Sequence, residues 1–200
     1  MHSTELTVIM PLYNQQNLFK VGLDSIPPRD DIEIIIIDDG STDDSLAEAR
    51  EYQSHSPKNI VILRNLENKG VAYTVNKGLD YAHGEYIVLL GSDGDYFVDL
   101  NRGINELDGT DLIYFPLRIN NGAYIDGKAG SSKFMRREFI GDTRNPLLVN
   151  CEDNAFYELL MKKNPTEKSI DCMCKHYNYP REHSLVWDVE HKITERGKEI

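Results

Sequence analysis

No apolar run in the sequence approaches the roughly 20 residues that a membrane-spanning helix needs. Residues 1–20 also contain neither the basic segment nor the long apolar segment of a secretory signal. Cysteine is scarce: the chain has three, an odd number, and Cys172 and Cys174 are too close for an easy disulfide. These absences argue against a membrane span and a disulfide framework, and they predict a cytoplasmic protein in a reducing compartment.

Basic residues are few relative to acidic ones, with 22 Lys and Arg against 33 Asp and Glu and a net charge of -11. Such a chain repels a polyanion, so nucleic acid is not an expected partner. A divalent cation fits this balance better, although many of the acids, such as Glu195 and Glu199, are ordinary surface residues. The 200 residues, 40% of them hydrophobic, suffice for one domain and are too few for two.

The most informative stretch contains four consecutive isoleucines, Ile34–Ile37, followed by two acids. Because β-branched side chains suit the pleat and no position has to face water, this run predicts a strand buried on both faces, as in a parallel sheet. Asp38 and Asp39 follow at its carboxyl end, and Gly40 allows a sharp bend into a helix. Open α/β sheets bind their ligands at the carboxyl ends of such strands.

Strands and helices alternate over the first half of the chain. The strand that begins at Glu5 is expected to stop at Pro11, and the helix that follows Gly70 is expected to end near His83, with Gly84 as its C′ residue. This alternation predicts a parallel, layered α/β sheet with right-handed crossovers. The other predicted elements are helices over 15–24, up to about 107 and over 155–163, and strands over 59–63, 85–90, 111–118 and 169–179.

A second pair of acids, Asp93 and Asp95, follows the strand over 85–90. Because the carboxyl ends of parallel strands face one crevice, these acids and Asp38 and Asp39 are expected to converge there. Carboxylate oxygens select magnesium, manganese or calcium, and a metal-bound diphosphate is the natural ligand. Taken alone, the pentapeptide Gly91–Asp95 is better explained as a simple acidic glycine turn.

Five motifs, in register, resemble those of family 2 glycosyltransferases of the GT-A fold. The resemblance is dense over residues 5–95 and patchy to about residue 186. The motifs are V-I-M-P-L-Y-N (Val8–Asn14), I-I-D-D-G-S-T-D (Ile36–Asp43), N-K-G-V-A-Y-T-V-N-K-G-L (Asn68–Leu79), G-E-Y-I (Gly84–Ile87) and E-D-N-A-F (Glu152–Phe156).

The resemblance implies a nucleotide site at the positions that match these motifs. The first loop packs on the base in the family, and a carboxylate at the position of Asp39 accepts a hydrogen bond from uracil. The residues that the resemblance assigns to the nucleotide are Pro11, Tyr13, Asp39, Asn68, Lys69, Gly70 and Ser92.

The family's Asp-x-Asp motif falls on Gly91-Ser92-Asp93, so its first acid is missing here. The resemblance implies that Asp93 binds Mn²⁺ or Mg²⁺. Asp95 either joins the metal, directly or through water, or faces solvent, and solvent is the favoured expectation. His183 is a further candidate metal ligand.

The resemblance also implies that Asp153 is the catalytic base, supported by Glu152. A base is required because a sugar hydroxyl is a poor nucleophile until its proton is removed. Without the resemblance, these two acids read as a charge pair that favours the helix macrodipole. Lys133, Arg136 and Arg137 form a small basic cluster that is expected to be a solvated face.

The sequence therefore predicts a GT-A type α/β domain spanning residues 1–200. It comprises a Rossmann-like nucleotide-binding half (about 1–95), a smaller metal and acceptor half (about 96–186) and a charged tail (187–200), with further domains of a longer chain left open. The resemblance implies metal-dependent, inverting transfer of a sugar from a nucleotide diphosphate donor, UDP-linked, to the hydroxyl of a glycan or other acceptor, as in glycan biosynthesis. One alternative is a catalytically silent nucleotide-sugar binding module. The other is a nucleotidyltransferase, which would carry a Gly-rich basic loop where this chain has P-L-Y-N-Q-Q-N.

Overall fold

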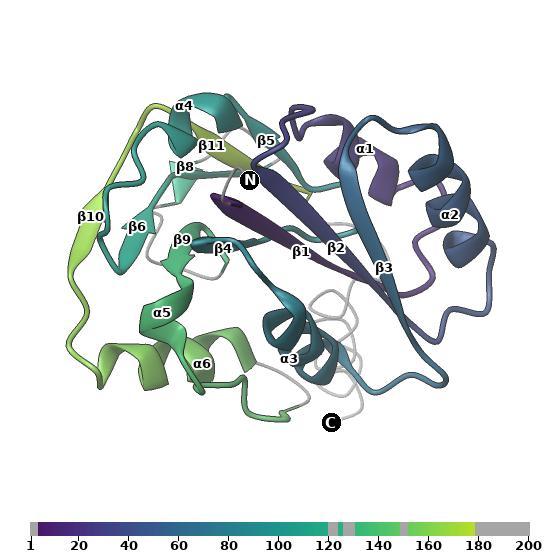
Figure 1. Cartoon of the computed structure of the whole chain (residues 1–200). Coiled ribbons are helices and arrows are strands. Elements are labelled where there is room, and N and C mark those ends of the chain that lie inside the picture. Colours follow the sequence, from purple (N-terminus) through teal and green to yellow (C-terminus); the bar gives the residue numbers. More distant parts are fainter. Residues whose placement is uncertain (1–3, 120–123, 126–130, 149–151, 179–200) are drawn as a thin grey trace, which may run out of the picture.

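The computed structural model describes residues 4–119, 124–125, 131–148 and 152–178, and it contains two β-sheets (Figure 1). The main sheet contains β1 (Leu6–Leu12), β2 (Ile32–Asp39), β3 (Asn59–Asn65), β4 (Tyr86–Leu89), β6 (Leu112–Tyr114), β9 (Lys133–Arg136) and β10 (Glu167–Ser169). The second sheet contains β5 (Tyr96–Val98), β7 (Leu117–Ile119), β8 (Tyr124–Ile125) and β11 (Cys174–Tyr177). The helices are α1 (Phe19–Asp24), α2 (Ser45–His55), α3 (Val71–Tyr81), α4 (Leu100–Ile104), α5 (Arg137–Ile140) and α6 (Glu152–Met161).

The main sheet is mostly parallel, which confirms the predicted fold class. Its strand order is β10-β6-β9-β4-β1-β2-β3, and only β9 runs antiparallel to its two neighbours. The strands β6, β9 and β10 come from the second half of the sequence, so both halves of the chain build one continuous sheet. In the part of the chain that the structure describes, no helix has the length and apolar character that crossing a membrane requires.

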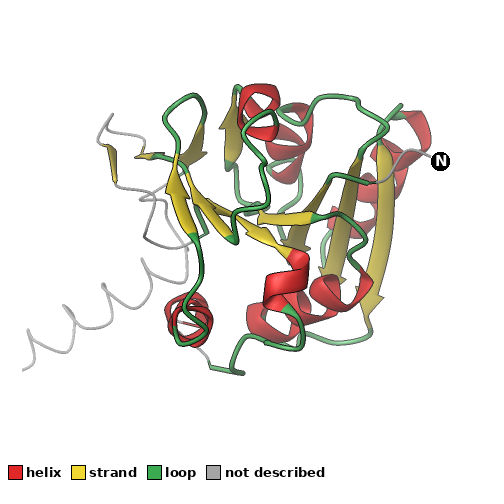
Figure 2. Ribbon diagram, turned by 60° about the vertical axis from the view of Figure 1, so that its left-hand side comes forward, coloured by secondary structure: helices red, strands yellow, loops and turns green. Residues whose placement is uncertain are grey.

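Helices cover both faces of the main sheet (Figures 1 and 2). One face packs on α1, α2 and α4, and the other packs on α3, α5 and α6. Successive side chains of β2 therefore enter different cores: Ile34 and Ile36 face the first set of helices, and Ile35 and Ile37 face the second. Two-sided burial is the physical reason for the unbroken isoleucine run.

Several predicted element ends in the first half of the chain are wrong: α1 begins at Phe19 instead of residue 15, β3 ends at Asn65 instead of residue 63, and the structure explains two others. Pro11 does not stop β1, which continues to Leu12 with Pro11 paired to Ile37. The ladder to β4 has already ended at Ile9, so the missing N–H of proline costs no sheet hydrogen bond. Gly84 is not a helix cap, because α3 ends at Tyr81. A Cβ at Gly84 would lie 2.5 Å from the Thr7 nitrogen, so glycine is needed here for close packing on β1.

The second half of the chain differs more from the predicted elements. Residues 96–98 form β5 before the short helix α4, and the expected single strand over 111–118 is two strands in different sheets, β6 and β7. β5 and β11 pair antiparallel, which brings residues 174–176 beside the segment that follows the acidic turn. The second sheet therefore lies next to the carboxyl end of β4.

Candidate functional site

The acids identified in the sequence lie at one edge of the main sheet. Asp38 and Asp39 are the last two residues of β2, and Asp93 and Asp95 follow the end of β4. β1 lies between these strands, so β2 and β4 are about 10 Å apart, two strand spacings. The two pairs do not form one cluster: among the described residues, no group of three or more His, Cys, Asp or Glu side chains could hold a metal ion.

Asp39 anchors the loop that leads into α3. Its Oδ1 accepts hydrogen bonds from the Asn65 side-chain amide (2.8 Å) and the Lys69 backbone N–H (3.0 Å). Its Oδ2 accepts one from the Gly70 N–H (2.9 Å). Gly70 has a φ of 87°, a conformation that favours glycine, and it is the residue just before α3. The buried carboxylate therefore fixes the 68–70 loop at the edge where the resemblance predicts a nucleotide.

Asn65 in turn fixes the carboxylate of Asp39. The Asn65 side chain is buried, and its Nδ2 also donates to the Thr74 hydroxyl in α3 at 3.1 Å. Its Oδ1 accepts a hydrogen bond from Lys77 Nζ at 2.9 Å. Every polar atom of the Asn65 amide group is thus engaged, which ties the ends of β2 and β3 to α3.

The neighbouring acid, Asp38, is fully buried and makes different contacts. Its Oδ1 accepts a hydrogen bond from the Ser41 N–H at 3.2 Å. Its Oδ2 lies 3.4 Å from Arg64 Nε, within ion-pair distance but outside hydrogen-bond geometry. Asp38 therefore stabilises the turn after β2, and Asp39 is the acid of this pair that faces the loop.

The other predicted nucleotide residues also lie along this edge. Pro11 is the second-last residue of β1, Tyr13 directly follows the strand and is exposed, and Ser92 is buried in the acidic turn. Asn68 Oδ1 accepts a hydrogen bond from the Gly70 N–H, and the Lys69 ammonium pairs with Glu67 on the surface. The exposed Tyr13 ring is available for stacking on a planar ligand.

The acidic turn after β4 is built around Gly91. A Cβ at this position would lie 2.6 Å from Asp93 Oδ1 and 2.8 Å from Asp95 Oδ2, so both carboxylates occupy the space that a side chain at residue 91 would need. The turn therefore brings two carboxylate oxygens together although the first acid of the expected motif is absent.

The expectation that Asp95 faces solvent is wrong. Asp95 is only 2% exposed, its Oδ1 accepts a hydrogen bond from the Asn178 N–H at 3.0 Å, and its Oδ2 lies 3.6 Å from Lys175 Nζ. Lys175, in β11, is itself 1% exposed. A buried carboxylate needs a counter-ion, and the second sheet supplies it. Asn178 also donates from its side chain to the backbone oxygen of Asp93 at 2.8 Å, which fixes the turn from the same side.

The predicted base, Asp153, is half-buried near the beginning of α6, which starts at Glu152. Its Oδ1 accepts a hydrogen bond from the Asn154 N–H at 2.9 Å. Lys133 faces the same helix and is only 4% exposed, with its Nζ 5.0 Å from the centre of the Tyr157 ring. Burial lowers the pKa of Lys133 to about 8, and the negative charge of Asp153 acts in the opposite direction. His183 lies outside the described residues.

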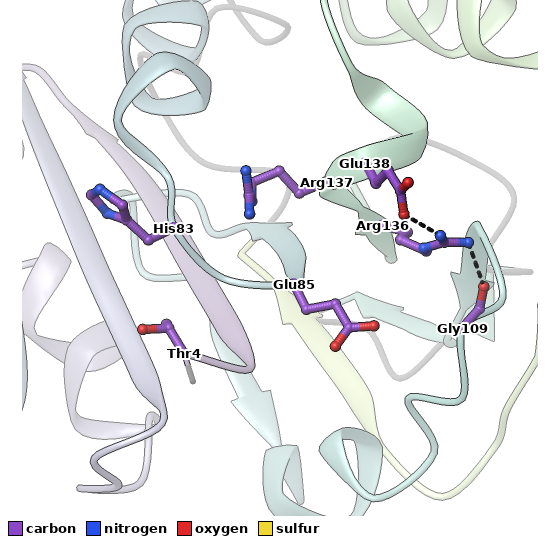
Figure 3. A pocket seen from close by; sticks show the side chains of 7 residues that line it. All are labelled: Thr4, His83, Glu85, Gly109, Arg136, Arg137 and Glu138. Carbon is purple, nitrogen blue, oxygen red and sulfur yellow. Dashed lines mark hydrogen bonds and ion pairs between the residues drawn. The ribbon is translucent and has the colours of Figure 1, made fainter. Parts of the chain in front are cut away.

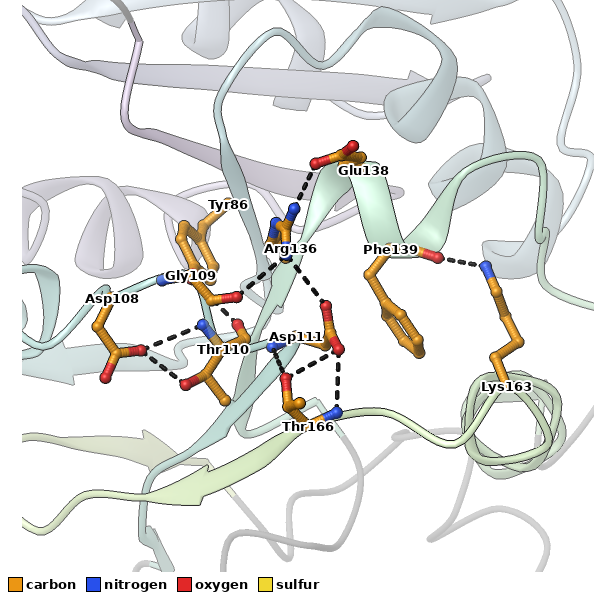
Figure 4. Close-up of polar contacts among 10 residues, drawn as sticks. All are labelled: Tyr86, Asp108, Gly109, Thr110, Asp111, Arg136, Glu138, Phe139, Lys163 and Thr166. Atoms are coloured by element: carbon orange, nitrogen blue, oxygen red, sulfur yellow. Dashed lines mark hydrogen bonds and ion pairs between the residues drawn. The ribbon is translucent and has the colours of Figure 1, made fainter.

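The expected basic surface cluster does not exist as one group, because Lys133 is buried and lies at the opposite end of β9 from Arg136 and Arg137. Arg136 lies at the far end of β9, where it donates to the Gly109 carbonyl at 3.1 Å and pairs with Asp111 and Glu138 (Figure 4). Arg137 donates from Nε to the Gly84 carbonyl at 2.8 Å.

A cavity of about 780 Å³ lies at that opposite edge of the sheet, next to the amino ends of β1 and β4. Figure 3 shows its lining: Thr4, His83, Glu85, Gly109, Arg136, Arg137 and Glu138. Open α/β sheets bind ligands at the carboxyl ends of their strands, so this cavity is not the candidate site.

Sequence reasoning missed two residues of the site, Asn65 and Lys175, and wrongly expected a third, Lys133, on a solvated face. The alternation in K-F-M-R (133–136) is a strand signal, and it would have placed Lys133 and Met135 on one face. No local signal marks Asn65 or Lys175, because their partners lie far away in the sequence. The pattern Cys172-x-Cys174-x-His176 forms no metal site with other described residues.

Comparison with known proteins gives a consistent result. The profile of the family described as "Glycosyl transferase family 2" matches residues 7–162. The chain is 35% identical over 96 residues to the poly(ribitol-phosphate) beta-glucosyltransferase of Bacillus spizizenii, an alignment that covers 46% of this chain and 15% of that protein.

Two solved structures share the fold. S. aureus TarS 1–349 in complex with UDP-GlcNAc has a TM-score of 0.77 at 20% identity, over 90% of this chain and 60% of that one. The mannosyltransferase PcManGT from Pyrobaculum calidifontis, in complex with GDP-Man and Mn²⁺, has a TM-score of 0.73 at 17% identity, over 96% and 61%. The chain thus spans less than two thirds of these proteins, and at such identities the likeness shows the fold alone.

Proposed function

Because the chain belongs to glycosyl transferase family 2, we propose that it transfers a sugar from a UDP-linked donor to a hydroxyl of a glycan or other acceptor, with inversion at the anomeric carbon. The observation that carries this proposal is the common edge shared by the Asp39-anchored loop, the acidic turn and the beginning of α6. Binding of UDP-GlcNAc by TarS, which has the same fold, supports the choice of donor.

In this proposal the uridine binds over the ends of β1 and β2. Tyr13 and Pro11 pack on the base, and Asp39 accepts a hydrogen bond from the uracil N–H with the lone pair that remains on Oδ2. Asn68, Lys69, Gly70 and Ser92 line the path of the nucleotide. The three donors that already hold the Asp39 carboxylate support this role, because an oriented acceptor discriminates between bases better than a mobile one.

The acidic turn suits a hard divalent cation, Mn²⁺ or Mg²⁺. Two carboxylate oxygens meet beside Gly91, and one or two carboxylates plus substrate phosphates is the usual magnesium arrangement. Asp93 is the proposed ligand, because it stands at the last acid of the family's Asp-x-Asp motif. When bound, the cation would neutralise negative charge that develops on the leaving diphosphate.

Asp153 is the proposed general base. The acceptor hydroxyl gives its proton to the Asp153 carboxylate as its oxygen bonds to the anomeric carbon, and the bond from that carbon to the diphosphate oxygen breaks with its electron pair. Attack on the face opposite the diphosphate produces inversion. Glu152, the preceding residue, supports the site in this proposal.

We also propose that residues 1–200 act as one catalytic domain, with a nucleotide half over about 1–95 and a metal and acceptor half over about 96–186. The shared sheet supports one domain, since β6, β9 and β10 extend the sheet formed by β1–β4. The segment 187–200 lies outside the described residues.

The test uses UDP-GlcNAc, UDP-glucose and GDP-mannose with manganese, and measures donor hydrolysis and thermal stabilisation. Asp153→Asn should preserve the fold and UDP affinity and lower turnover by roughly 10²- to 10⁴-fold. Glu152→Gln is the control and should lower turnover much less. Full turnover by Asp153→Asn would refute the base assignment.

A silent nucleotide-sugar binding module is the second candidate, and the ion pair between Asp95 and Lys175 favours it, since the Asp95 carboxylate is then not available to a metal. Stabilisation by UDP without turnover of any donor would support this candidate over the transferase.

A further inference from the structure

We propose that the cavity at the amino ends of β1 and β4 is a second binding site, which takes a small oxyanion that also carries hydroxyl groups: a phosphorylated sugar or a sugar acid. Arg137 binds the oxyanion, and Glu85 and His83 bind the hydroxyl groups. The cavity lies at the opposite edge of the main sheet from the proposed nucleotide site. This inference therefore does not depend on the proposed function.

The direction of β9 brings two arginines to this edge. β9 is antiparallel to β4 and β6, and its last residue, Arg136, pairs with Tyr86 at the beginning of β4. Arg137, which follows as the first residue of α5, lies at the same edge. The carboxyl end of β9 thus supplies charged side chains beside the amino ends of the parallel strands.

The cavity has the size and the lining of a site for a polar small molecule. Its volume of about 780 Å³ lies within the range of about 300–1,000 Å³ that small-molecule sites occupy. Apart from Gly109, every residue that Figure 3 shows around it has a polar or charged side chain. Such a lining suits a charged, hydroxyl-bearing ligand better than an apolar one.

Of the two arginines, Arg136 is already used by the protein. Its guanidinium group donates to the Gly109 carbonyl at 3.1 Å, lies 3.4 Å from Asp111 Oδ1 and pairs with Glu138 (Figure 3). The positive charge of Arg136 is therefore neutralised within the wall of the cavity.

Arg137 is the cation that the cavity offers to a ligand. Its Nε donates to the Gly84 carbonyl at 2.8 Å, and its backbone N–H donates to the Glu85 carbonyl at 2.8 Å. In the described part of the chain, its two terminal nitrogens have no hydrogen-bond or ion-pair partner. The guanidinium group is thus held through Nε, and its terminal N–H groups can bind two oxygens of a phosphate or carboxylate.

The carbonyl that orients Arg137 is itself fixed on β1. The Gly84 N–H donates to the Thr7 hydroxyl at 2.9 Å, and a Cβ at Gly84 would lie 2.5 Å from the Thr7 nitrogen. The Glu85 N–H donates to the Thr4 carbonyl at 3.1 Å. A guanidinium group oriented in this way before binding loses less side-chain entropy when it binds an oxyanion.

The remaining groups of the cavity suit hydroxyl groups. The Glu85 carboxylate accepts no hydrogen bond from the described residues and forms no ion pair with Arg137 among them. His83 Nδ1 lies 2.9 Å from Oε1 of the buried Glu33, and because a carboxylate only accepts, Nδ1 carries the hydrogen. The neutral imidazole then offers its Nε2 lone pair to a hydroxyl, since 75% of the His83 side chain is exposed.

These groups together define the class of ligand. An uncharged sugar leaves Arg137 without an anion. Inorganic phosphate brings negative charge close to Glu85 without the sugar hydroxyls that would bind this carboxylate. A sugar that carries a phosphate or a carboxylate satisfies both residues, so the cavity should prefer it to either simpler molecule.

The first experiment measures the binding of glucose 1-phosphate, glucuronate, glucose and inorganic phosphate by calorimetry, with UDP and manganese present to occupy the proposed nucleotide site. At least one of the two anionic sugars should bind more tightly than glucose and inorganic phosphate. The tighter of the two identifies the oxyanion as phosphate or carboxylate. Failure of both anionic sugars to bind the parent chain would overturn the inference.

Substitutions of Arg137 test the oxyanion position. Arg137→Gln should weaken the binding of that sugar by roughly 10- to 100-fold, because hydrogen bonds to a charged group are lost. Arg137→Lys keeps the charge without the planar guanidinium group and should show a smaller loss. Arg144→Gln is the matched control: this arginine pairs with Asp80 outside the cavity, so its removal should leave the affinity unchanged. Equal affinities of the parent and Arg137→Gln would overturn the inference.

Glu85→Ala tests the hydroxyl position. It should weaken the binding of the anionic sugar, because an acceptor is lost, and strengthen that of inorganic phosphate, because a like charge is removed. An unchanged affinity for the anionic sugar would overturn the role of Glu85.

A titration of the ¹⁵N-labelled parent chain locates the site without any substitution. The backbone amide signals of residues 83–85 and 136–138 should shift on addition of the sugar, and those of residues 68–70 should not. Shifts confined to residues 68–70 would place the sugar at the nucleotide edge and overturn the inference. A lack of UDP binding in the same samples would count against the proposed function alone.

Discussion

Removal of the Lys175 ammonium should destabilise the protein strongly, because it leaves the Asp95 carboxylate buried without its counter-ion. In Lys175→Met, the described partner that remains for Asp95 is the Asn178 N–H at 3.0 Å. Breaking a buried ion pair by removing one partner costs about 3–5 kcal/mol. For a domain of this size, that corresponds to a decrease in Tm of roughly 6–20 °C. The loss is a large part of a total stability of about 5–15 kcal/mol.

The assay is urea unfolding of the parent, Lys175→Met, Asp95→Asn and the double variant. The urea concentration at the midpoint of unfolding should decrease in both single variants, with an unchanged m-value. The double variant should recover most of the lost stability, because it carries neither buried charge. The coupling energy of this cycle measures the Asp95–Lys175 pair. A loss below about 1 kcal/mol in Lys175→Met would refute the argument, since that is the range of exposed pairs.

The same variants test whether Asp95 binds metal. If it does, manganese would replace the missing ammonium and raise the Tm of Lys175→Met more than that of the parent. We expect equal shifts, because the Asp95 oxygens face Asn178 and β11.

Three further predictions concern the nucleotide edge. Asp39→Asn should weaken UDP binding by about 1–3 kcal/mol, because an amide cannot accept all three of the present hydrogen bonds and the 68–70 loop loses its anchor; calorimetry showing parental affinity would contradict this. Asp93→Ala should abolish most of the tightening of UDP binding by manganese. At a UDP concentration of 100 times the Kd of the parent complex, UDP should stabilise the variant by less than the roughly 2.7 kcal/mol expected for the parent. If the parent binds UDP equally well with metal and with chelator, the metal role is ruled out. Gly91→Ala should displace the Asp93 carboxylate. The free energy lost from the manganese-dependent part of UDP binding should exceed the free energy lost from folding, as measured by Tm; the opposite result would show that the turn serves stability alone.

The nucleotide half could be predicted from the sequence because its signals are local. The isoleucine run, the acids at its end and Gly40 lie within a few residues of one another, and each has one natural structural explanation. The resulting strand is β2, which is buried on both faces as expected. Where local pattern and fold agree in this way, the position of Asp39 at the sheet edge follows directly.

The second half could not be predicted in the same detail because its strands are short and its pairings are distant. β5, β6 and β7 have three residues each, too few for a periodic pattern to identify them. β5 pairs with β11, about 80 residues later. Lys133 is expected at the surface because lysine is rarely buried, whereas in the structure α6, which comes later in the chain, packs over it.

The departure from the Asp-x-Asp motif also depends on contacts between distant residues, which the sequence does not reveal. In the sequence, Gly91 is a missing acid that Asp95 could replace. In the structure, the Asp95 carboxylate lies beside the Gly91 Cα, and a Cβ there would come within 2.8 Å of its Oδ2. Residue 91 can therefore be glycine because Asp95 fills the space, and Asp95 can fill it because Lys175 neutralises its charge from another sheet. The three positions form one unit, so restoring an acid at residue 91 alone would displace the Asp95–Lys175 pair rather than complete the motif.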